Sequence, residues 1–194
     1  GIGADGIILM EGSRKADAKM RMFNADGSEG SMAGNALRCM AKYLYDNGIV
    51  RKEEMTLETD KGTKTVRVYT TDGRVTSACV DMGYATLDTT ALHLNLPEKE
   101  IVGYPVTIGE KEYAITCVDM GNPHCVVFCS RVDGVDVARI GPQFEHAPYF
   151  PDRINTEFIR VVNPSTIKMR VWERGSGETL ACGTGACAGT VASI

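Results

Sequence analysis

In several parts of the chain, hydrophobic and polar residues alternate with the period of two that is typical of β-strands. The strand-like runs fill the middle of the chain, and the first two are joined by Thr71-Asp72-Gly73, which is a hairpin turn signal. The runs lie at residues 64–69, 75–82, 104–108, 113–120, 125–129, 157–162 and 166–172. Residues 133–153 have the character of helix or loop, because Gly141-Pro142, Pro148 and Pro151 interrupt them.

A segment near the start of the chain returns near its end. Lys19-Met-Arg-Met-Phe-Asn24 is followed, at an offset of 149 residues, by Lys168-Met-Arg-Val-Trp-Glu173. The same offset relates Glu29 to Glu178 and Gly34 to Gly183. Self-similarity of this kind indicates two related lobes.

Each copy of the repeat has the same local order: a short apolar strand, a loop rich in Gly, Ser and Glu, and then small residues that open a helix. In the first copy the helix begins near Ala33 and runs to about Asp46, where Asn47-Gly48 stops it. In the second copy the helix begins near Cys182 and continues toward the end of the chain.

These patterns predict an α+β fold with two pseudo-symmetric lobes, each an antiparallel sheet or barrel wrapped around a central helix. We place the N-terminal lobe at residues 1–118 and the C-terminal lobe at residues 119–194. Parts of each lobe have no counterpart in the repeat, so we expect the N-terminal lobe to be truncated at its start and the C-terminal lobe at its end. The complete molecule would have on the order of 270 to 300 residues if its domains keep their usual size.

Composition and charge narrow the class of function. The 194 residues are 43% hydrophobic and 24% charged, which suits a globular chain with one large core or two smaller ones. The net charge is −4 and no basic run is interleaved with aromatic residues, so we expect no nucleic-acid partner. No apolar run reaches the roughly 18 to 20 residues of a membrane span, so we expect no membrane partner and a cytoplasmic protein.

The seven cysteines and three histidines form no recognisable metal site. None of the cysteines is spaced as Cys-x-x-Cys, and no metal-ligand spacing links them to His93, His124 or His146. We therefore expect reduced thiols and no bound metal.

The start of the second predicted helix is the strongest candidate for chemistry. In Ala181-Cys-Gly-Thr-Gly185 the first N–H groups of the helix and its macrodipole would face a ligand, and the glycines would let it approach closely. A helix start also lowers the pKa of a thiol, so Cys182 could exchange a proton near neutral pH. Glu173, Arg174 and Glu178 in the preceding loop could supply a carboxylate clamp and hydrogen bonds. Alternatively, Cys182 is a small buried residue and the glycines only permit tight packing.

The first helix start repeats this arrangement without a thiol. Asn24-Ala-Asp-Gly-Ser-Glu29 and Gly34-Asn35 are rich in amide and backbone donors. Two such helix starts facing one cleft would present acid/base groups to opposite faces of one carbon, which is the geometry of stereoinversion. The repeat predicts a thiol at position 33, where the chain has Ala33. Cys39 lies about 240° further round the helix, so we expect it to pack in the core.

A loop before one of the predicted strands contains a further candidate. Asn122 and His124, in Asp119-Met-Gly-Asn-Pro-His124, could hydrogen-bond a substrate or orient a thiol. A single histidine after a proline-bearing turn is also common as a structural residue. Cys125 and Cys129 share one face of the apolar strand that follows, and we expect both to be core residues.

Several of these segments occur together in one known enzyme family, in the same order along the chain. They are Gly1-Ile-Gly-Ala-Asp-Gly6, Phe23-Asn-Ala-Asp-Gly-Ser-Glu29, Gly34-Asn35, Arg38-Cys39, Gly121-Asn-Pro-His124, Asn155, Glu173-Arg-Gly-Ser-Gly-Glu178 and Ala181-Cys-Gly-Thr-Gly185. In these segments the sequence closely resembles diaminopimelate epimerase, a PLP-independent enzyme that interconverts LL- and meso-diaminopimelate for lysine and peptidoglycan synthesis.

The resemblance implies two lobes around a cleft, a homodimer, no cofactor, and a cysteine from each lobe acting as acid and base. By position, Cys182 is one catalytic thiol, Ala33 stands where the other is expected, and His124 and Glu173 assist proton transfer. Substrate contacts are implied for Asn24, Gly34, Asn35, Asn122, Asn155, Glu173, Arg174, Gly183 and Thr184.

Two departures from the family leave three hypotheses open. Ala33 replaces a catalytic cysteine, and Ala36 replaces a glycine that is usual in the first helix start. The first hypothesis is an epimerase that lacks one of its two thiols. The second is a sister racemase or isomerase that acts on proline or another small substrate. The third is a binding protein that keeps the cleft and has lost the chemistry.

Overall fold

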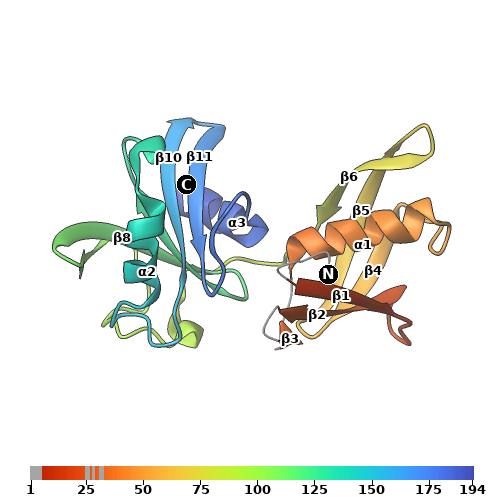
Figure 1. Cartoon of the computed structure of the whole chain (residues 1–194), viewed down its shortest axis with the longest axis horizontal. Helices are drawn as coiled ribbons and strands as arrows, with labels where there is room; N and C mark the ends of the chain where they lie inside the picture. Colours follow the sequence, from red (N-terminus) through yellow and green to blue (C-terminus); the bar gives the residue numbers. More distant parts are fainter. Residues whose placement is uncertain (1–5, 25–26, 28, 31–32) are drawn as a thin grey trace. The chain divides into compact units, whose positions relative to one another are not determined.

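The computed structural model describes residues 6–24, 27, 29–30 and 33–194. The chain divides into two compact units, Gly1–Met82 and Gly83–Ile194, and each contains its own sheet and at least one helix (Figure 1). The units are described separately below.

The boundary between the units differs from the one expected after residue 118. Strand β7 (Tyr104–Ile108) pairs with β8 (Lys111–Asp119), and β8 pairs with β9 (Pro123–Phe128). This hairpin makes its backbone hydrogen bonds in the second sheet. Residues 83–118 therefore belong to the second unit, although they precede the second copy of the repeat in the sequence.

The first unit is a sheet of order β1-β2-β4-β5-β6, with β3 paired to β2 and one helix across a face of the sheet (Figure 1). The elements are β1 (Gly6–Glu11), β2 (Ala18–Asn24), β3 (Glu29–Gly30), α1 (Gly34–Asp46), β4 (Glu54–Thr59), β5 (Gly62–Thr71) and β6 (Arg74–Val80). Leu37, Met40, Ala41 and Leu44 recur at helical spacing on α1 and are buried against the sheet. The hairpin turn is confirmed, since Asp72 and Gly73 both have positive φ, 52° and 76°.

The second unit is a sheet of order β12-β11-β10-β9-β8-β7. Its other elements are the short turns η1 (Thr90–Leu92) and η2 (Val132–Gly134), α2 (Val137–Glu145), β10 (Asn155–Asn163), β11 (Thr166–Glu173), β12 (Gly177–Thr179) and α3 (Gly183–Ala192). The buried ring of Phe144 on α2 lies edge-on between Tyr113 and Phe158, with ring centres 5.0 Å and 5.6 Å away. This cluster anchors α2 to the sheet.

The pairing registers of the two sheets bear out the internal repeat. Met22 pairs with Gly30 in the first unit, and Val171 pairs with Thr179 at the same offset in the second. Ile7 pairs with Phe23, and Thr156 pairs with Trp172. Even an ion pair is repeated: Arg21 Nε lies 2.7 Å from Glu29 Oε1, and Arg170 Nε lies 2.7 Å from Glu178 Oε1. The β1-β2-β3-α1 segment is therefore the structural counterpart of β10-β11-β12-α3.

The α+β class is confirmed, but the sheets are mixed rather than antiparallel. In the first unit β2 and β4 are parallel, and in the second β9 and β10 are parallel. A helix connects the strands in each case, α1 in the first unit and α2 in the second. Parallel strands require such a crossover, so the helices impose the pairing that the local patterns did not reveal.

Candidate active site

Cys182 is the N-terminal cap of helix α3. Its backbone is extended, with φ −125° and ψ 115°, and its Sγ accepts a hydrogen bond of 3.3 Å from the amide of Gly185. The first intrahelical bond joins the amide of Ala186 to the carbonyl of Cys182. The amides of Gly183 and Thr184 therefore precede the bonded part of the helix, beside a thiol that is only 9% exposed.

The expectation that the helix start lowers the pKa of this thiol is wrong. Burial raises the pKa of Cys182 from 9.0 to about 11. Hydrogen bonds from Thr184 and the Gly185 amide lower the pKa, but the nearby carboxylates of Glu173 and Glu157 raise it. The thiol of Cys182 is therefore neutral at neutral pH.

Glycines allow α3 to lie directly on β10. A Cβ atom at Gly185 would lie 2.6 Å from Glu157 Oε1 and 3.2 Å from Cys182 Sγ, and one at Gly189 would lie 2.2 Å from Ile159 Cδ1. At Gly183 a Cβ atom would meet nothing within 4 Å, so this glycine leaves the helix start open. Tight packing therefore accounts for Gly185 and Gly189, whereas no packing contact requires a glycine at position 183.

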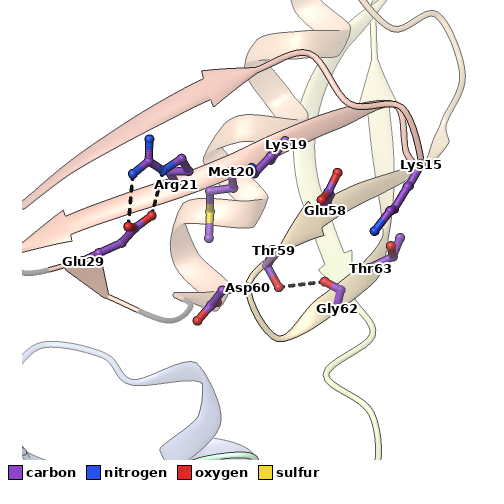
Figure 2. A pocket seen from close by; sticks show the side chains of 10 residues that line it. All are labelled: Lys15, Lys19, Met20, Arg21, Glu29, Glu58, Thr59, Asp60, Gly62 and Thr63. Atoms are coloured by element: carbon purple, nitrogen blue, oxygen red, sulfur yellow. Dashed lines mark hydrogen bonds and ion pairs between the residues drawn. The ribbon is translucent and has the colours of Figure 1, made fainter.

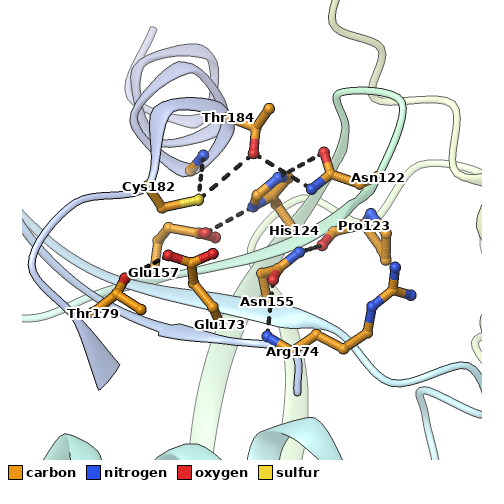
Figure 3. Close-up of polar contacts among 11 residues, drawn as sticks. Asn122, Pro123, His124, Asn155, Glu157, Glu173, Arg174, Thr179, Cys182 and Thr184 are labelled. Carbon is orange, nitrogen blue, oxygen red and sulfur yellow. Dashed lines mark hydrogen bonds and ion pairs between the residues drawn. The ribbon is translucent and has the colours of Figure 1, made fainter. Parts of the chain in front are cut away.

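A polar chain runs from the thiol into the sheet (Figure 3). Cys182 Sγ lies 3.6 Å from Thr184 Oγ1, which accepts a bond of 3.4 Å from Asn122 Nδ2. Asn122 Oδ1 lies 3.1 Å from His124 Nε2, and His124 Nδ1 lies 2.7 Å from Glu157 Oε1. The structure thus brings Asn122, His124, Thr184 and Cys182 together, as expected, and adds Glu157.

Glu157 is a site residue that the sequence analysis did not select. Its side chain is completely buried, and so are the adjacent residues on β10, Thr156 and Phe158. A carboxylate within a run of buried strand residues was the available signal, because acidic side chains are rarely buried without a partner.

Three more of the predicted site residues, Asn155, Glu173 and Arg174, make hydrogen bonds at the loop before α3. Glu173 accepts a hydrogen bond from the hydroxyl of Thr179. Asn155 Nδ2 donates to the carbonyl of Pro123 at 2.8 Å, and Asn155 Oδ1 accepts from the amide of Arg174 at 2.9 Å. Asn155 therefore ties the loop that contains Arg174 to the loop that leads to His124, while the Arg174 side chain stays exposed.

The expected residues of the first unit lie around the start of α1. Ala33 caps this helix with φ −132° and ψ 118°, close to the values at Cys182, but it makes no side-chain capping bond. Gly34 opens the helix, and the Asn35 side chain accepts a hydrogen bond from Arg38. The side chain of Asn24 lies outside the described residues, as do residues 25, 26 and 28 of the same loop.

Only some of the cysteines that were expected in the core are buried there. Cys125 is fully buried, as expected, and Cys129 is partly buried against the core of the second unit. Cys39 is exposed, so its expected role in the core is wrong. The buried stripe of α1 passes through Leu37 and Met40, and position 39 lies about 200° away from Leu37 around the helix.

A separate pocket of about 440 Å³ lies between β2 and β4 of the first unit (Figure 2). It is lined by Lys15, Lys19, Met20, Arg21, Glu29, Glu58, Thr59, Asp60, Gly62 and Thr63. Of the expected substrate-binding residues whose side chains the structure describes, none lines it. Two of its carboxylates already have partners, Glu29 with Arg21 at 2.7 Å and Glu58 with Ser13 at 2.6 Å.

Within the described ranges, no group of three or more His, Cys, Asp or Glu residues is arranged to hold a metal ion. None of the helices described is long and apolar enough to cross a membrane.

Solved structures define the class of fold. A probable proline racemase from Agrobacterium radiobacter superposes with a TM-score of 0.70 at 17% identity, covering 97% of this chain and 59% of that protein. A hydroxyproline epimerase from Agrobacterium vitis superposes with a TM-score of 0.69 at 17% identity, covering 98% and 60%. The fold is therefore that of the two-lobed amino-acid racemases and epimerases.

Sequence comparison identifies the family within this class. The diaminopimelate epimerase family profile matches residues 1–87 and 116–194. Diaminopimelate epimerases from Desulfovibrio desulfuricans and Acetivibrio thermocellus are each 50% identical over the whole of this chain, which spans 70% and 69% of their lengths. One from Methanothermobacter thermautotrophicus is 45% identical, with 68% of its length covered. The chain belongs to the diaminopimelate epimerase family.

Proposed function

We propose that this protein acts on diaminopimelate as an epimerase whose second lobe supplies one acid/base thiol, Cys182, and whose first lobe has Ala33 at the position of the other. The observation that carries the proposal is the match between the two helix starts. Both capping residues have extended backbones that differ by 7° in φ and 3° in ψ, and each precedes a glycine that opens its helix. A side chain at position 33 would thus leave its helix as Cys182 leaves α3.

Inversion at a carbon requires a base on one face and an acid on the other. Cys182 starts as a neutral thiol, so it delivers a proton to the α-carbon, and a base on the opposite face must remove the original proton. In the reverse direction the Cys182 thiolate takes the α-proton. Ala33 has no titratable side chain, so the first lobe supplies no thiol for the opposite face.

The other residues of the site bind the substrate and stabilise developing charge. The amides of Gly183 and Thr184 at the start of α3 would receive the carboxylate next to the reacting carbon. Gly34 and Asn35 at the start of α1 would be substrate contacts of the first unit. Asn24, Asn122 and Arg174 would contact the rest of the substrate, with Asn155 holding the Arg174 backbone. Glu173 and His124 would assist proton transfer at the Cys182 side. We place this activity in the cytoplasm, in a homodimer without a cofactor.

The first prediction concerns position 33. We expect Ala33→Cys to raise the rate of inversion between LL- and meso-diaminopimelate roughly a hundredfold or more, because it restores a general acid/base on the second face. The rate is measured by chiral chromatography. Ala33→Ser is the matched control, since a hydroxyl of similar size is a far weaker acid and base at neutral pH.

Three results would decide against this function. Equal inversion rates for the Ala33 protein and Ala33→Cys would show that a second thiol is not limiting. Inversion of proline but not of diaminopimelate by Ala33→Cys would favour a sister racemase, which the fold alone also permits. Tight binding of diaminopimelate without proton exchange in either protein would favour a binding protein.

A further inference from the structure

The buried pair of His124 and Glu157 is the most unusual feature of the second unit. Both side chains are completely inaccessible to water, and His124 Nδ1 lies 2.7 Å from Glu157 Oε1 (Figure 3). They come from the parallel neighbours β9 and β10. The second carboxylate oxygen, Glu157 Oε2, is buried and has no hydrogen-bond partner in the described part of the chain.

The contacts of Asn122 locate a proton on this pair. Asn122 Oδ1 can only accept a hydrogen bond, and it lies 3.1 Å from His124 Nε2, so Nε2 must carry a hydrogen. His124 Nδ1 then either receives a hydrogen bond from a protonated Glu157 or donates one to the Glu157 carboxylate. In both cases the pair shares one additional proton and has no net charge.

Burial favours this neutral state. An unpaired carboxylate without access to water is strongly unfavourable, and an uncompensated charge would remain if the pair lost its proton. Burial raises the pKa of Glu157, and the charge of Glu173 adds to this increase, while His124 opposes it. The other titratable groups nearby are thiols, namely Cys182 on α3, Cys125 on β9 and Cys117, the partner of Cys125 on β8.

We propose that Glu157 is a positioning residue, which shares a proton with His124 and thereby holds the Asn122 amide with its NH₂ group toward Thr184 and Cys182. This inference rests on the proposed function. If Nε2 lost its hydrogen, Asn122 would have to turn its NH₂ group toward His124. Its oxygen would then point toward Thr184, replacing a donor with an acceptor beside the thiol.

An orienting role fits the geometry better than a proton relay. The path from His124 to Cys182 passes through the amide of Asn122, which cannot transfer a proton without changing its bonding. The hydroxyl of Thr184 and the amide of Asn122 instead form a fixed row of hydrogen-bonding groups ahead of the thiol. A donor presented in this row suits a carboxylate of the substrate.

The first lobe has different residues at the positions that correspond to Glu157 and Gly185. At the repeat offset, Ile8 corresponds to Glu157 and Ala36 corresponds to Gly185. The carboxylate and the glycine are coupled, because a Cβ atom at position 185 would lie 2.6 Å from Glu157 Oε1. At these two described positions, the first lobe thus has neither the acid nor the glycine that makes room for it.

The test compares Glu157→Gln and Glu157→Leu with Thr156→Val. Glutamine can donate to His124 Nδ1 as a protonated glutamate does, whereas leucine cannot. Thr156→Val is the matched control, since Thr156 is buried on the same strand and its hydroxyl has no partner among the described residues. We expect Glu157→Leu to lower the rate of α-proton exchange roughly tenfold or more, Glu157→Gln to retain it within about threefold, and Thr156→Val to leave it unchanged.

A second measurement does not depend on activity. The ¹⁵N shifts of the His124 ring, assigned by comparison with His124→Gln, should show a hydrogen on Nε2 at neutral pH in the parent protein. A ring with its only hydrogen on Nδ1 would overturn the proposal, and so would a folded Glu157→Leu protein that exchanges as fast as Thr156→Val. If the parent protein and Ala33→Cys both lack activity, the proposed function fails, while the ring signals still decide whether Glu157 shares the proton.

Discussion

At the scale of single residues, the state of the Cys182 thiol reflects two opposing influences. The helix start favours the thiolate through the amide of Gly185, but burial and two neighbouring carboxylates favour the thiol, and they prevail. A helix start is therefore not sufficient to activate a cysteine. The sequence identified the cap correctly and not its protonation state, because the burial of position 182 and the approach of Glu157 depend on how α3 packs against β10.

The raised pKa predicts how Cys182 reacts with iodoacetamide, which attacks thiolates. We expect slow alkylation at neutral pH and a rate that increases with pH until about 11, the pKa of this thiol. Glu173→Gln should lower that pKa and accelerate alkylation at neutral pH, because it removes a negative charge that favours the thiol. Peptide mass spectrometry after timed labelling separates Cys182 from the other cysteines.

Glu178→Gln is the control for this experiment. It removes a carboxylate that pairs with Arg170 and is not among the groups that raise the pKa of Cys182. Rapid alkylation of Cys182 at neutral pH in the parent protein would contradict the neutral thiol.

At the scale of elements, α2 holds the loop that leads to the site. Glu145, the last residue of α2, is 4% exposed. Its Oε2 accepts a bond of 2.7 Å from Trp172 Nε1, and its Oε1 accepts from the amide of Gly175 at 2.9 Å. Gly141 lets α2 approach, since a Cβ atom there would lie 2.4 Å from the Trp172 ring. One carboxylate thus fixes the strand end and the turn on either side of Glu173 and Arg174.

This carboxylate predicts a pH dependence of stability. Burial raises the pKa of Glu145, but the hydrogen bonds from Trp172 and Gly175 and nearby positive charge leave it below its ordinary value of 4.5. Since the folded-state pKa is depressed, the stabilisation is present above pH 4.5 and is lost as the pH falls through the folded-state pKa. We expect Glu145→Gln to reduce the free energy of unfolding by about 1–3 kcal/mol at neutral pH, since one acceptor is lost.

Urea unfolding at neutral pH and in acid measures this effect. The difference between Glu145→Gln and the parent protein should become smaller in acid, where Glu145 is protonated in both states. Glu110→Gln, in the exposed turn between β7 and β8, is the control and should change stability little at either pH. A difference that does not depend on pH would show that Glu145 does not stabilise the fold as a carboxylate.

Local sequence patterns predicted those helices and turns that depend only on residues close together in the chain. The helix from Gly34 to Asp46 and the β5-β6 hairpin follow from helical spacing and a turn with two positive φ angles. β4 has the alternating burial of a strand, but Met55 and Leu57 are its only apolar residues and did not produce a clear run. The parallel pairing of β9 with β10 depends on a crossover, which no local pattern shows.

At the scale of the whole molecule, the two lobes share a backbone plan and differ in chemistry. Pairing registers, an ion pair and the dihedral angles of the helix caps are repeated, whereas Cys182, Glu157 and Gly185 correspond to Ala33, Ile8 and Ala36. Repetition of the backbone was predictable from the sequence, since short identical segments reveal it. The asymmetry of the buried acid was not, because Glu157 becomes part of the site only when β9 and β10 lie side by side.

The thiol at position 182 and the alanine at position 33 predict that the protein exchanges the α-proton at L centres or at D centres, but not at both. In D₂O the parent protein should exchange the α-proton of only one configuration at the reacting carbon, because the proposed mechanism has one thiol, Cys182, and Ala33 has no titratable side chain. The rate should increase with pH, since exchange requires the Cys182 thiolate and the pKa of this thiol is about 11. Proton NMR of LL- and DD-diaminopimelate measures exchange at L and D centres separately, with Cys182→Ala as the inactive control. In Ala33→Cys both configurations should exchange, because each face then has a thiol. Equal exchange of both configurations by the parent protein would mean that another group acts as the second base, and the missing thiol would not limit the reaction.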